Sequence, residues 1–257
     1  MSDQISTFYN QLAADYHFIF ADWRKSVLRQ SEVLDKLIRA QTGSGGRRVL
    51  DCSCGIGTQA IGLAVRGYKV HATDLSPEAV ERARHEAEQF KVELTFGLAD
   101  FRELESAVPG TFEVVLSCDN SLAHMLTADD LQAAFASMLT KVEPGGLLLL
   151  SIRDYDQTVQ EKPRSTLPAV SEGPDGRTIS FQVWDWAADG KSYTLNHFTV
   201  KQAGADWHTS NRTAQLRAWQ RSEFDALLAQ VGFTDITWHM PADSGYYQPI
   251  VTAHRPE

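Results

Sequence analysis

The sequence has few cysteines. Only Cys52, Cys54 and Cys118 occur among its 257 residues. Three thiols do not make a disulfide framework, and the Cys-x-Cys spacing is neither that of a zinc site nor that of a thioredoxin motif. His, Asp and Glu also do not cluster at ligand spacing. We therefore expect buried structural cysteines and no bound metal.

Positive charge is also scarce. The chain has 24 Lys and Arg residues against 33 Asp and Glu residues, which gives a net charge of −9. A protein that binds nucleic acid needs a basic patch for the phosphates, and no run rich in Lys or Arg occurs in this chain. The sequence therefore disfavours DNA and RNA as partners.

Long apolar runs are missing as well. The longest, LLLL at 147–150, is far too short to span a bilayer. The first twenty residues are acidic and polar, whereas a signal peptide would be basic and then apolar. We expect a cytoplasmic protein without membrane contact. Hydrophobic residues still make up 43% of the chain, enough for the core of one large domain.

Strand-like and helix-like segments alternate from residue 49 to 152. Near-continuous apolar strands alternating with helices predict a parallel sheet covered on both faces, with ligands at the carboxyl ends of the strands. The expected strands are 47–53, 69–76, 92–100, 112–120 and 147–153, and the expected helices are 58–67, 77–90 and 128–142.

Short polar motifs mark the ends of these elements. Ser76 before Pro77 predicts the start of the second helix. Thr127 with Asp130 resembles a capping box for the third helix. The sequence EPGG at 143–146 predicts a turn before the fifth strand.

The pattern changes after residue 153, where alternating polar and apolar residues predict antiparallel strands. We expect a hairpin over 178–202 with DG in its turn, a third strand over 207–219, a helix over 223–231 capped by Ser222 and Asp225 and ended by Gly232, and two strands over 233–240 and 248–256.

A glycine-containing loop, GIGTQA at 55–60, follows the first expected strand. Such loops let the backbone approach a nucleotide-like ligand. Three acids, Asp51, Asp74 and Asp100, end the first three strands. Asp74 lies 23 residues after Asp51 (74 − 51), close to the spacing of a carboxylate that binds ribose hydroxyls.

Two ligands compete for this loop. GIGTQA fits the G-x-G-x-x-A pattern of NAD-binding proteins, so a NAD-dependent oxidoreductase is one alternative. Asp51 would repel a pyrophosphate but attract an ammonium. S-adenosylmethionine (SAM) carries an ammonium, a sulfonium, a ribose and an adenine, and no phosphate. Asp100 followed by Phe101 suits the adenine, so the residues favour SAM.

Several segments together resemble the class I SAM-dependent methyltransferases. They are VLDCSCGIGTQAIGLA at 49–64, VHATDLSPEAV at 70–80, LADFREL at 98–104 and EPGGLLLL at 143–150. Within that class, LSCDNSLAHM at 116–125 and SIRDYD at 151–156 are similar to the glycine/sarcosine N-methyltransferase branch.

The resemblance covers nearly the whole chain and implies one methyltransferase domain of the α/β class. Its core would be a Rossmann-like, doubly wound, mostly parallel seven-stranded sheet. The implied parts are N-terminal lid helices at 1–45, a SAM-binding core at 46–153, an antiparallel substrate-covering insertion at 154–218, and a C-terminal helix and strands at 219–257 that complete the sheet.

The resemblance also implies a cofactor site. The glycine loop would hold the methionine part of SAM, Asp74 the ribose, and Asp100 the adenine. Lid residues would face the sulfonium or pair with the methionine carboxylate, where Lys25 is an alternative to Arg24. The implied cofactor-binding residues are Tyr16, Trp23, Arg24, Asp51, Ser53, Gly55, Gly57, Asp74, Leu75, Asp100, Phe101, Cys118 and His124.

Asn120, Arg153 and Tyr155 are the implied substrate-binding residues. In the resembling family, the arginine of this motif grips the carboxylate of an amino-acid substrate, and a guanidinium suits a carboxylate bidentately. The chain departs from the family by having Asp154 where an asparagine is usual. An alternative is that Arg153 pairs structurally with Asp154 or Asp156.

The implied reaction is methyl transfer to a small-molecule acceptor, with an amine nitrogen of an amino acid or related metabolite favoured. Such a reaction needs alignment and exclusion of water more than chemical activation. His197 and Tyr193, in the expected hairpin, are candidates for accepting a proton. Methylation of an oxygen is the main alternative, and a SAM-binding protein without catalysis is another. The oligomeric state is left open.

Overall fold

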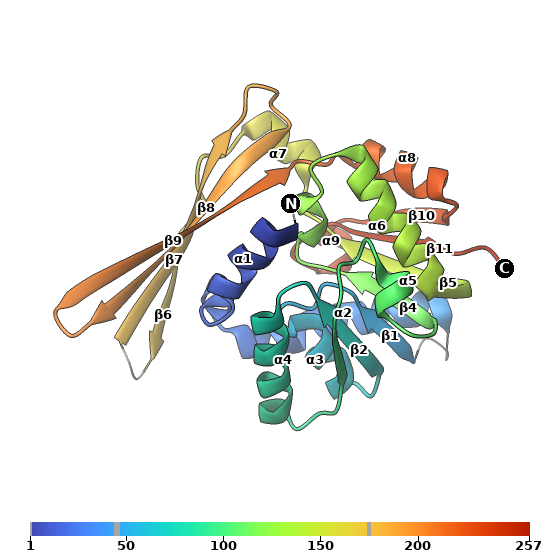
Figure 1. Cartoon of the computed structure of the whole chain (residues 1–257), viewed down its shortest axis with the longest axis horizontal. Helices are drawn as coiled ribbons and strands as arrows, with labels where there is room; N and C mark the ends of the chain where they lie inside the picture. The colour runs from blue at the N-terminus through green and yellow to red at the C-terminus, as the bar shows by residue number, and fades with distance from the viewer. Residues whose placement is uncertain (1, 44–46, 174–175) are drawn as a thin grey trace.

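Two β-sheets dominate the protein (Figure 1), which a computed structural model describes at residues 2–43, 47–173 and 176–257. The larger sheet has seven strands in the order β10-β11-β5-β4-β1-β2-β3. Six of these strands run in the same direction, and β11 runs in the opposite direction between β10 and β5. The predicted α/β fold with a mostly parallel seven-stranded sheet is confirmed. Its strands are β1 (Arg48–Asp51), β2 (Lys69–Asp74), β3 (Thr95–Leu98), β4 (Phe112–Ser117), β5 (Val142–Ser151), β10 (Thr234–His239) and β11 (Ile250–His254).

Helices cover both faces of the larger sheet. One face carries α2 (Trp23–Thr42), α3 (Thr58–Val65) and α4 (Pro77–Phe90), and the other carries α5 (Leu104–Ala107), α6 (Ala128–Lys141) and α8 (Arg221–Val231). The remaining helices are α1 (Ser2–Leu12), η1 (Tyr16–Ile19), η2 (Ser121–His124), α7 (Tyr155–Glu161) and α9 (Pro241–Ser244). Among the described residues, no helix has the length and apolar character needed to cross a membrane.

The leucine run at 147–150 builds both layers of the core. Successive side chains of a strand point to opposite faces. Leu147 and Leu149 therefore pack with α2 and α3, while Leu148 and Leu150 pack with α6 and α8. All four are at most 1% exposed. A strand covered on both faces needs such an unbroken apolar run.

Two of the predicted helix caps are confirmed. The Ser76 hydroxyl accepts a hydrogen bond from the Ala79 amide at 3.0 Å, at the start of α4. The Thr127 hydroxyl accepts one from the Asp130 amide at 3.1 Å, at the start of α6. Each bond satisfies an amide that the first helical turn leaves without a partner.

The predicted cap at Ser222 and Asp225 is wrong. Helix α8 begins at Arg221, and Gln220 forms a capping box with Glu223. Gln220 and Glu223 have the same three-residue spacing as Ser222 and Asp225, so spacing alone did not choose between the pairs. Gly232 ends the helix with φ at +114°, as predicted.

The predicted turn at 143–146 lies inside β5. The strand runs from Val142 to Ser151, and its register against β4 shifts between Phe112 and Val114. Gly145 takes φ at +69°, and its amide donates to the Arg255 carbonyl at 2.9 Å. The two glycines therefore form an irregularity within the strand rather than its boundary.

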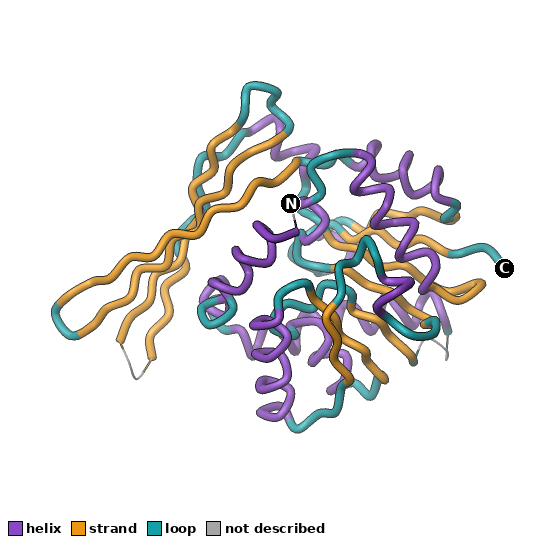
Figure 2. The backbone as a smooth tube through the Cα atoms, viewed as in Figure 1, coloured by secondary structure: helices purple, strands orange, loops and turns teal. Residues whose placement is uncertain are grey.

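The insertion is a separate antiparallel sheet of four strands (Figure 2). The hairpin at DG is confirmed, with Asp189 accepting the amides of Lys191 and Ser192 in the turn. The first strand was not predicted, because AVSEG is short and lacks clear alternation. The strands are β6 (Ala169–Gly173), β7 (Gly176–Trp186), β8 (Ser192–Ala203) and β9 (Asp206–Arg217).

The first two helices, α1 and η1, lie between the two sheets (Figure 1). Asp15, between α1 and η1, is only 5% exposed and pairs with two cations of the insertion. Its oxygens lie 2.9 Å from Arg212 Nη2 and 2.5 Å from Lys201 Nζ. Arg212 also donates to the Gln11 carbonyl at 2.8 Å. This ion-pair cluster fixes the N-terminal helices against the smaller sheet.

We predict that Asp15→Asn lowers the free energy of unfolding by roughly 3 kcal/mol, because it leaves the largely buried Arg212 without its charge partner. Denaturant unfolding measures the change. Glu172→Gln, which removes an exposed pair with Arg177, is the control and should change stability very little. Equal effects of the two substitutions would contradict the structural role of the cluster.

Candidate functional site

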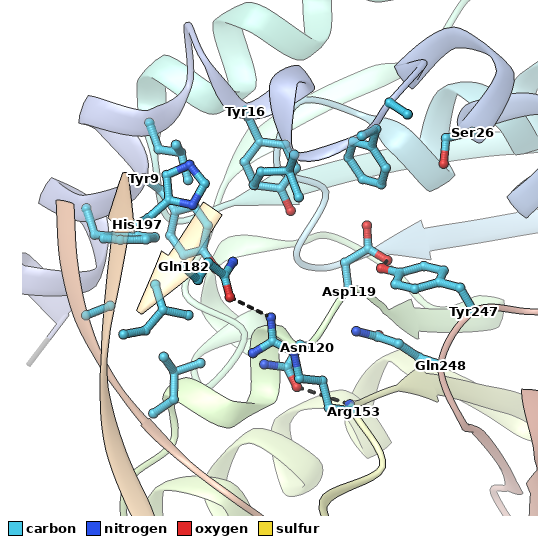
Figure 3. A pocket seen from close by; sticks show the side chains of 18 of the residues that line it. Tyr9, Tyr16, Ser26, Asp119, Asn120, Arg153, Gln182, His197, Tyr247 and Gln248 are labelled. Atoms are coloured by element: carbon cyan, nitrogen blue, oxygen red, sulfur yellow. Dashed lines mark hydrogen bonds between the residues drawn. The ribbon is translucent and has the colours of Figure 1, made fainter. Parts of the chain in front are cut away.

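Three adjoining cavities lie at the carboxyl ends of β1, β2 and β4. The large cavity, of about 800 Å³, lies between the N-terminal helices and the insertion (Figure 3). The loop cavity lies against the glycine loop, and the strand-tip cavity lies at the ends of β2 and β3. Tyr9 lines all three, so they meet at this side chain.

The glycine loop is shaped by backbone conformations that few residues tolerate. Gly57 has φ at +93°, and a Cβ there would lie 2.7 Å from Cδ1 of Ile61. Gly55 has φ at +52°, lines the loop cavity, and donates its amide to Asp74 at 2.8 Å. Both glycines are therefore required by the loop itself. Ser53 and Cys118 line the same region, as the sequence implied.

Asp74 lies where the loop cavity and the strand-tip cavity adjoin. Its two oxygens accept the amides of Gly55 and Ser76, at 2.8 and 2.9 Å. Burial raises its pKa, although these hydrogen bonds oppose the rise. A carboxylate fixed by two backbone amides is oriented in advance for ligand hydroxyls.

Leu75 and Phe101 line the strand-tip cavity together with Asp100. Burial tends to raise the pKa of Asp100, but hydrogen bonds from Arg102 outweigh it and leave the pKa lowered. The guanidinium of Arg102 also contacts Asp130 at 3.0 Å. Asp100 is thus held as a charged acceptor beside an apolar, aromatic wall.

Asp51 lies deeper than the sequence suggested. Its side chain is fully buried and lines none of the three cavities. Oδ1 accepts the Ser53 amide at 3.3 Å, whereas Oδ2 has no hydrogen-bond partner among the described residues. Burial raises the pKa of Asp51 to about 8. The residue is therefore largely protonated at neutral pH in this form of the protein.

His124 and Tyr9 join the strand-tip cavity to the large cavity. The Tyr9 hydroxyl lies 2.9 Å from His124 Nε2. Burial lowers the pKa of His124 to about 4, so its imidazole is neutral at physiological pH. The pair closes one wall by hydrogen bonding and adds no charge to it.

Arg153 lies in the wall of the large cavity, buried among polar and aromatic groups (Figure 3). Nη1 donates to the Tyr193 hydroxyl at 3.0 Å, and Nη2 to Gln182 Oε1 at 3.1 Å. The guanidinium carbon lies 4.6 Å from the ring centre of Trp184. None of these groups is an anion.

The acids that follow Arg153 in sequence do not neutralise it. Asp154 and Asp156 instead pair with Arg221, at 3.0 and 2.7 Å. In the described part of the chain, no carboxylate lies within ion-pair distance of Arg153. This excludes the structural pairing considered from the sequence.

Asn120 and Tyr155 support Arg153 instead of presenting free polar groups. Asn120 Oδ1 accepts the Arg153 amide at 3.2 Å, and its Nδ2 donates to the Tyr155 hydroxyl at 3.0 Å. Tyr155 also lies 2.8 Å from the Tyr193 hydroxyl. Asn120 lines the large cavity, whereas Tyr155 is buried behind it.

The two candidate proton acceptors differ in position. His197 lines the large cavity, and burial lowers its pKa to about 4. Tyr193 does not line it, because its ring packs between Trp184 and Trp186 and its hydroxyl holds Arg153. Of the two, only His197 faces the space available to a ligand.

The implied lid residues differ in whether they reach a cavity. Tyr16 lines both the large cavity and the loop cavity. Trp23 is buried outside the cavities and donates to Thr58 Oγ1 at 2.9 Å. Arg24 is exposed, with its guanidinium 4.4 Å from the ring centre of Phe90. Lys25, the alternative cation, lies at the large cavity.

Residues 49–146 match the protein family described as Methyltransferase domain. The chain carries a methyltransferase domain. Among relatives, the chain is 25% identical to the glycine/sarcosine N-methyltransferase of Aphanothece halophytica over 227 residues, 86% of this chain and 78% of the relative. It is 28% identical to the ubiquinone biosynthesis O-methyltransferase of Alkalilimnicola ehrlichii over 201 residues, 78% of this chain and 69% of the relative.

The same fold occurs among solved structures. SAM-bound CalS10, an amino pentose methyltransferase from Micromonospora echinaspora, superposes with a TM-score of 0.72 at 20% identity. The alignment covers 94% of this chain and 95% of that protein. This likeness supports the methyltransferase fold, and the relatives include methyltransferases for both nitrogen and oxygen.

The large cavity is also lined by residues that the sequence did not indicate as site residues, among them Tyr9, Asp119, Gln182 and Tyr247. Asp119 directly precedes Asn120, so the same motif could have indicated it. Tyr9 and Gln182 reach the cavity from α1 and β7, whose placement the sequence pattern does not give. Tyr247 carried only the weak signal of a paired tyrosine.

We predict that Asp51 makes the stability of the protein fall with rising pH. Its folded pKa, about 8, exceeds the usual aspartate value of 3.8, so folding favours the protonated form. The contribution is fully present below pH 4 and is lost as the pH rises to 8. Denaturant unfolding between pH 5 and 8.5 should show a smaller loss for Asp51→Asn. Parallel pH profiles of the two proteins would contradict this assignment.

Proposed function

We propose that this methyltransferase transfers a methyl group from SAM to the nitrogen of a small acceptor that also carries an anionic group, such as an amino acid or a related metabolite. The observation that carries the proposal is Arg153, a largely buried guanidinium that lines the large cavity and has no carboxylate partner among the described residues. Burying an unpaired charge is costly, so an anionic ligand would stabilise this wall.

The chemistry of the small cavities fits SAM. Asp74 lines both small cavities and Asp51 lies buried behind them, and burial raises the pKa of each carboxyl. A ligand with a fixed positive charge would favour their ionised forms, whereas a pyrophosphate would be repelled. Phe101 and Leu75 offer an apolar surface to an adenine. These features support SAM over NAD.

When bound, SAM supplies a methyl group already activated by the sulfonium. The protein's own task is to hold the acceptor in line and to exclude water. We propose that residues 1–45 act as the lid and residues 154–218 as the substrate cover. Tyr9 and Tyr16 support this role, because they line the passage between the small cavities and the large one.

Methylation of an oxygen is the second candidate, favoured by similarity to an O-methyltransferase of ubiquinone biosynthesis. The two candidates differ in what Arg153 contributes. A phenolic acceptor without an anionic group gains nothing from a buried guanidinium, whereas an amino acid gains a bidentate partner. Arg153 therefore favours the nitrogen acceptor, as does the similarity to a glycine/sarcosine N-methyltransferase.

We predict that Asp74→Ala weakens binding of S-adenosylhomocysteine by at least about 100-fold, because charge-assisted hydrogen bonds to the ribose are lost. Isothermal titration calorimetry measures the affinity. Asp35→Asn is the control, because Asp35 on α2 contacts Tyr68 and Arg39 and lines none of the three cavities. Unchanged affinity in a folded Asp74→Ala protein would refute the ribose assignment.

We predict that Arg153→Ala raises KM for a carboxylated amine by about 100-fold, since two charge-assisted hydrogen bonds are lost. S-adenosylhomocysteine affinity should stay within about threefold of wild type. Arg153→Lys keeps the charge without the fork geometry and should recover part of the loss. Release of S-adenosylhomocysteine over a panel of amino acids, amines and phenols gives KM. If both affinities fall together, or neither changes, the proposal fails.

A further inference from the structure

Asp119 adds a carboxylate, opposite in sign to Arg153, to the wall of the large cavity. It lies two residues after the end of β4 and lines both the large cavity and the loop cavity. Figure 3 shows its carboxyl group directed into the space between Tyr16 and Tyr247. A group bound to this carboxylate would therefore lie where the two cavities meet.

The backbone at this position is strained. Asp119 has φ at +59° and Asn120 has φ at +73°, two consecutive non-glycine residues in the left-handed region. This conformation costs free energy for residues with a Cβ. It turns the chain between β4 and η2 so that Asp119 faces the cavity while Asn120 reaches Arg153. The strain thus places the two charged groups on one wall.

The Asp119 carboxylate has hydrogen-bond donors but no cation. Oδ1 accepts from the hydroxyls of Tyr247 and Tyr246, the latter at 3.2 Å. In the described residues, no Lys, Arg or His nitrogen lies within ion-pair distance of Asp119. Burial raises its pKa, against the hydrogen bonds of the tyrosines. A cationic ligand group would supply the missing partner.

We propose that Asp119 binds the amino group of the acceptor, so that Arg153 and Asp119 hold the two ends of a zwitterion. The inference rests on the proposed function and deepens it, because it assigns the residue that selects an amine. An ammonium can donate several charge-assisted hydrogen bonds to a carboxylate, whereas a hydroxyl donates one. The nitrogen held by Asp119 would lie beside the loop cavity, where the methyl donor is proposed to bind. It would pass one proton to the Asp119 carboxylate before its lone pair attacks the methyl carbon.

A competing role for Asp119 is to pair with the ammonium of SAM in the loop cavity. The position of its partners favours the acceptor: Tyr247 lines the large cavity and does not line the loop cavity. The loop cavity also has its own carboxylate, Asp74. Binding measurements on the two ligands separately distinguish the roles.

The test uses three probes that differ by one charged group each. Phenylalanine carries both groups, 3-phenylpropanoate lacks the amine, and 2-phenylethylamine lacks the carboxylate. The cavity volume of about 800 Å³ and its apolar side chains, Phe8, Leu12, Leu195 and Leu216, accommodate the phenyl ring. Calorimetry with saturating S-adenosylhomocysteine measures each affinity without turnover.

Asp119→Asn should weaken phenylalanine and 2-phenylethylamine by about 10- to 100-fold and leave 3-phenylpropanoate unchanged. The matched variant Arg153→Gln should weaken phenylalanine and 3-phenylpropanoate and leave 2-phenylethylamine unchanged. Asn is tolerated in the left-handed region, so the backbone at 119 is retained. The affinity for S-adenosylhomocysteine alone should be the same in Asp119→Asn and wild type.

Each outcome decides a different claim. If Asp119→Asn binds both amines as tightly as wild type does, the inference about Asp119 is overturned. If it loses S-adenosylhomocysteine affinity instead, the residue serves the donor and the inference also falls. If Arg153→Gln binds 3-phenylpropanoate normally, the proposed anionic acceptor is wrong, while the response to 2-phenylethylamine still tests Asp119.

Discussion

A charge held away from water must be paired or must change its protonation state, and this constraint governs the strand ends of the methyltransferase. Asp51, Asp74 and Asp119 surround the glycine loop, and burial raises the pKa of each. Among the described residues, the guanidinium of Arg153 donates to neutral side chains, Tyr193 and Gln182. We propose that ligands supply the opposite charges that both kinds of group lack.

The larger sheet positions the acids, and the insertion positions the groups around Arg153. Parallel strands β1, β2 and β4 bring the three acids to one edge, because their carboxyl ends coincide. The insertion supplies two neutral hydrogen-bond partners to Arg153. These are Gln182 on β7 and Tyr193 on β8, which are paired strands. Aromatic residues of the insertion therefore act largely by supporting Arg153: Trp184 lies under its guanidinium and packs on Tyr193.

The sequence predicted the core well, because its signals are local. An apolar run such as 147–150 and a cap such as Ser76 depend on neighbours in the chain, and the structure has both. It predicted the site less completely. The depth of Asp51 and the exposure of Arg24 depend on how α2 and the loop pack. Asp119 was missed because its place in the cavity wall depends on a left-handed backbone conformation, which its residue type does not predict.

The insertion shows the same limit. The DG hairpin was predicted, since a turn and its alternating strands are local features. Strand β6 was not, because its pairing with β7 depends on a strand that comes later in the chain. The same register places His197 on the cavity side and Phe198 on the opposite face, where it stacks on Phe181. Sequence alone did not fix that choice.

A crystal structure of the complex with S-adenosylhomocysteine would test whether the methyl donor binds at the strand ends and leaves the large cavity to the acceptor. We expect the ribose at Asp74, the adenine beside Phe101, and the homocysteine along the glycine loop. The sulfur should then be directed past Tyr9 toward Asp119, with the large cavity left for an acceptor that reaches Arg153. If S-adenosylhomocysteine instead binds in the large cavity, with its carboxylate on Arg153, the proposed division between donor and acceptor sites is wrong.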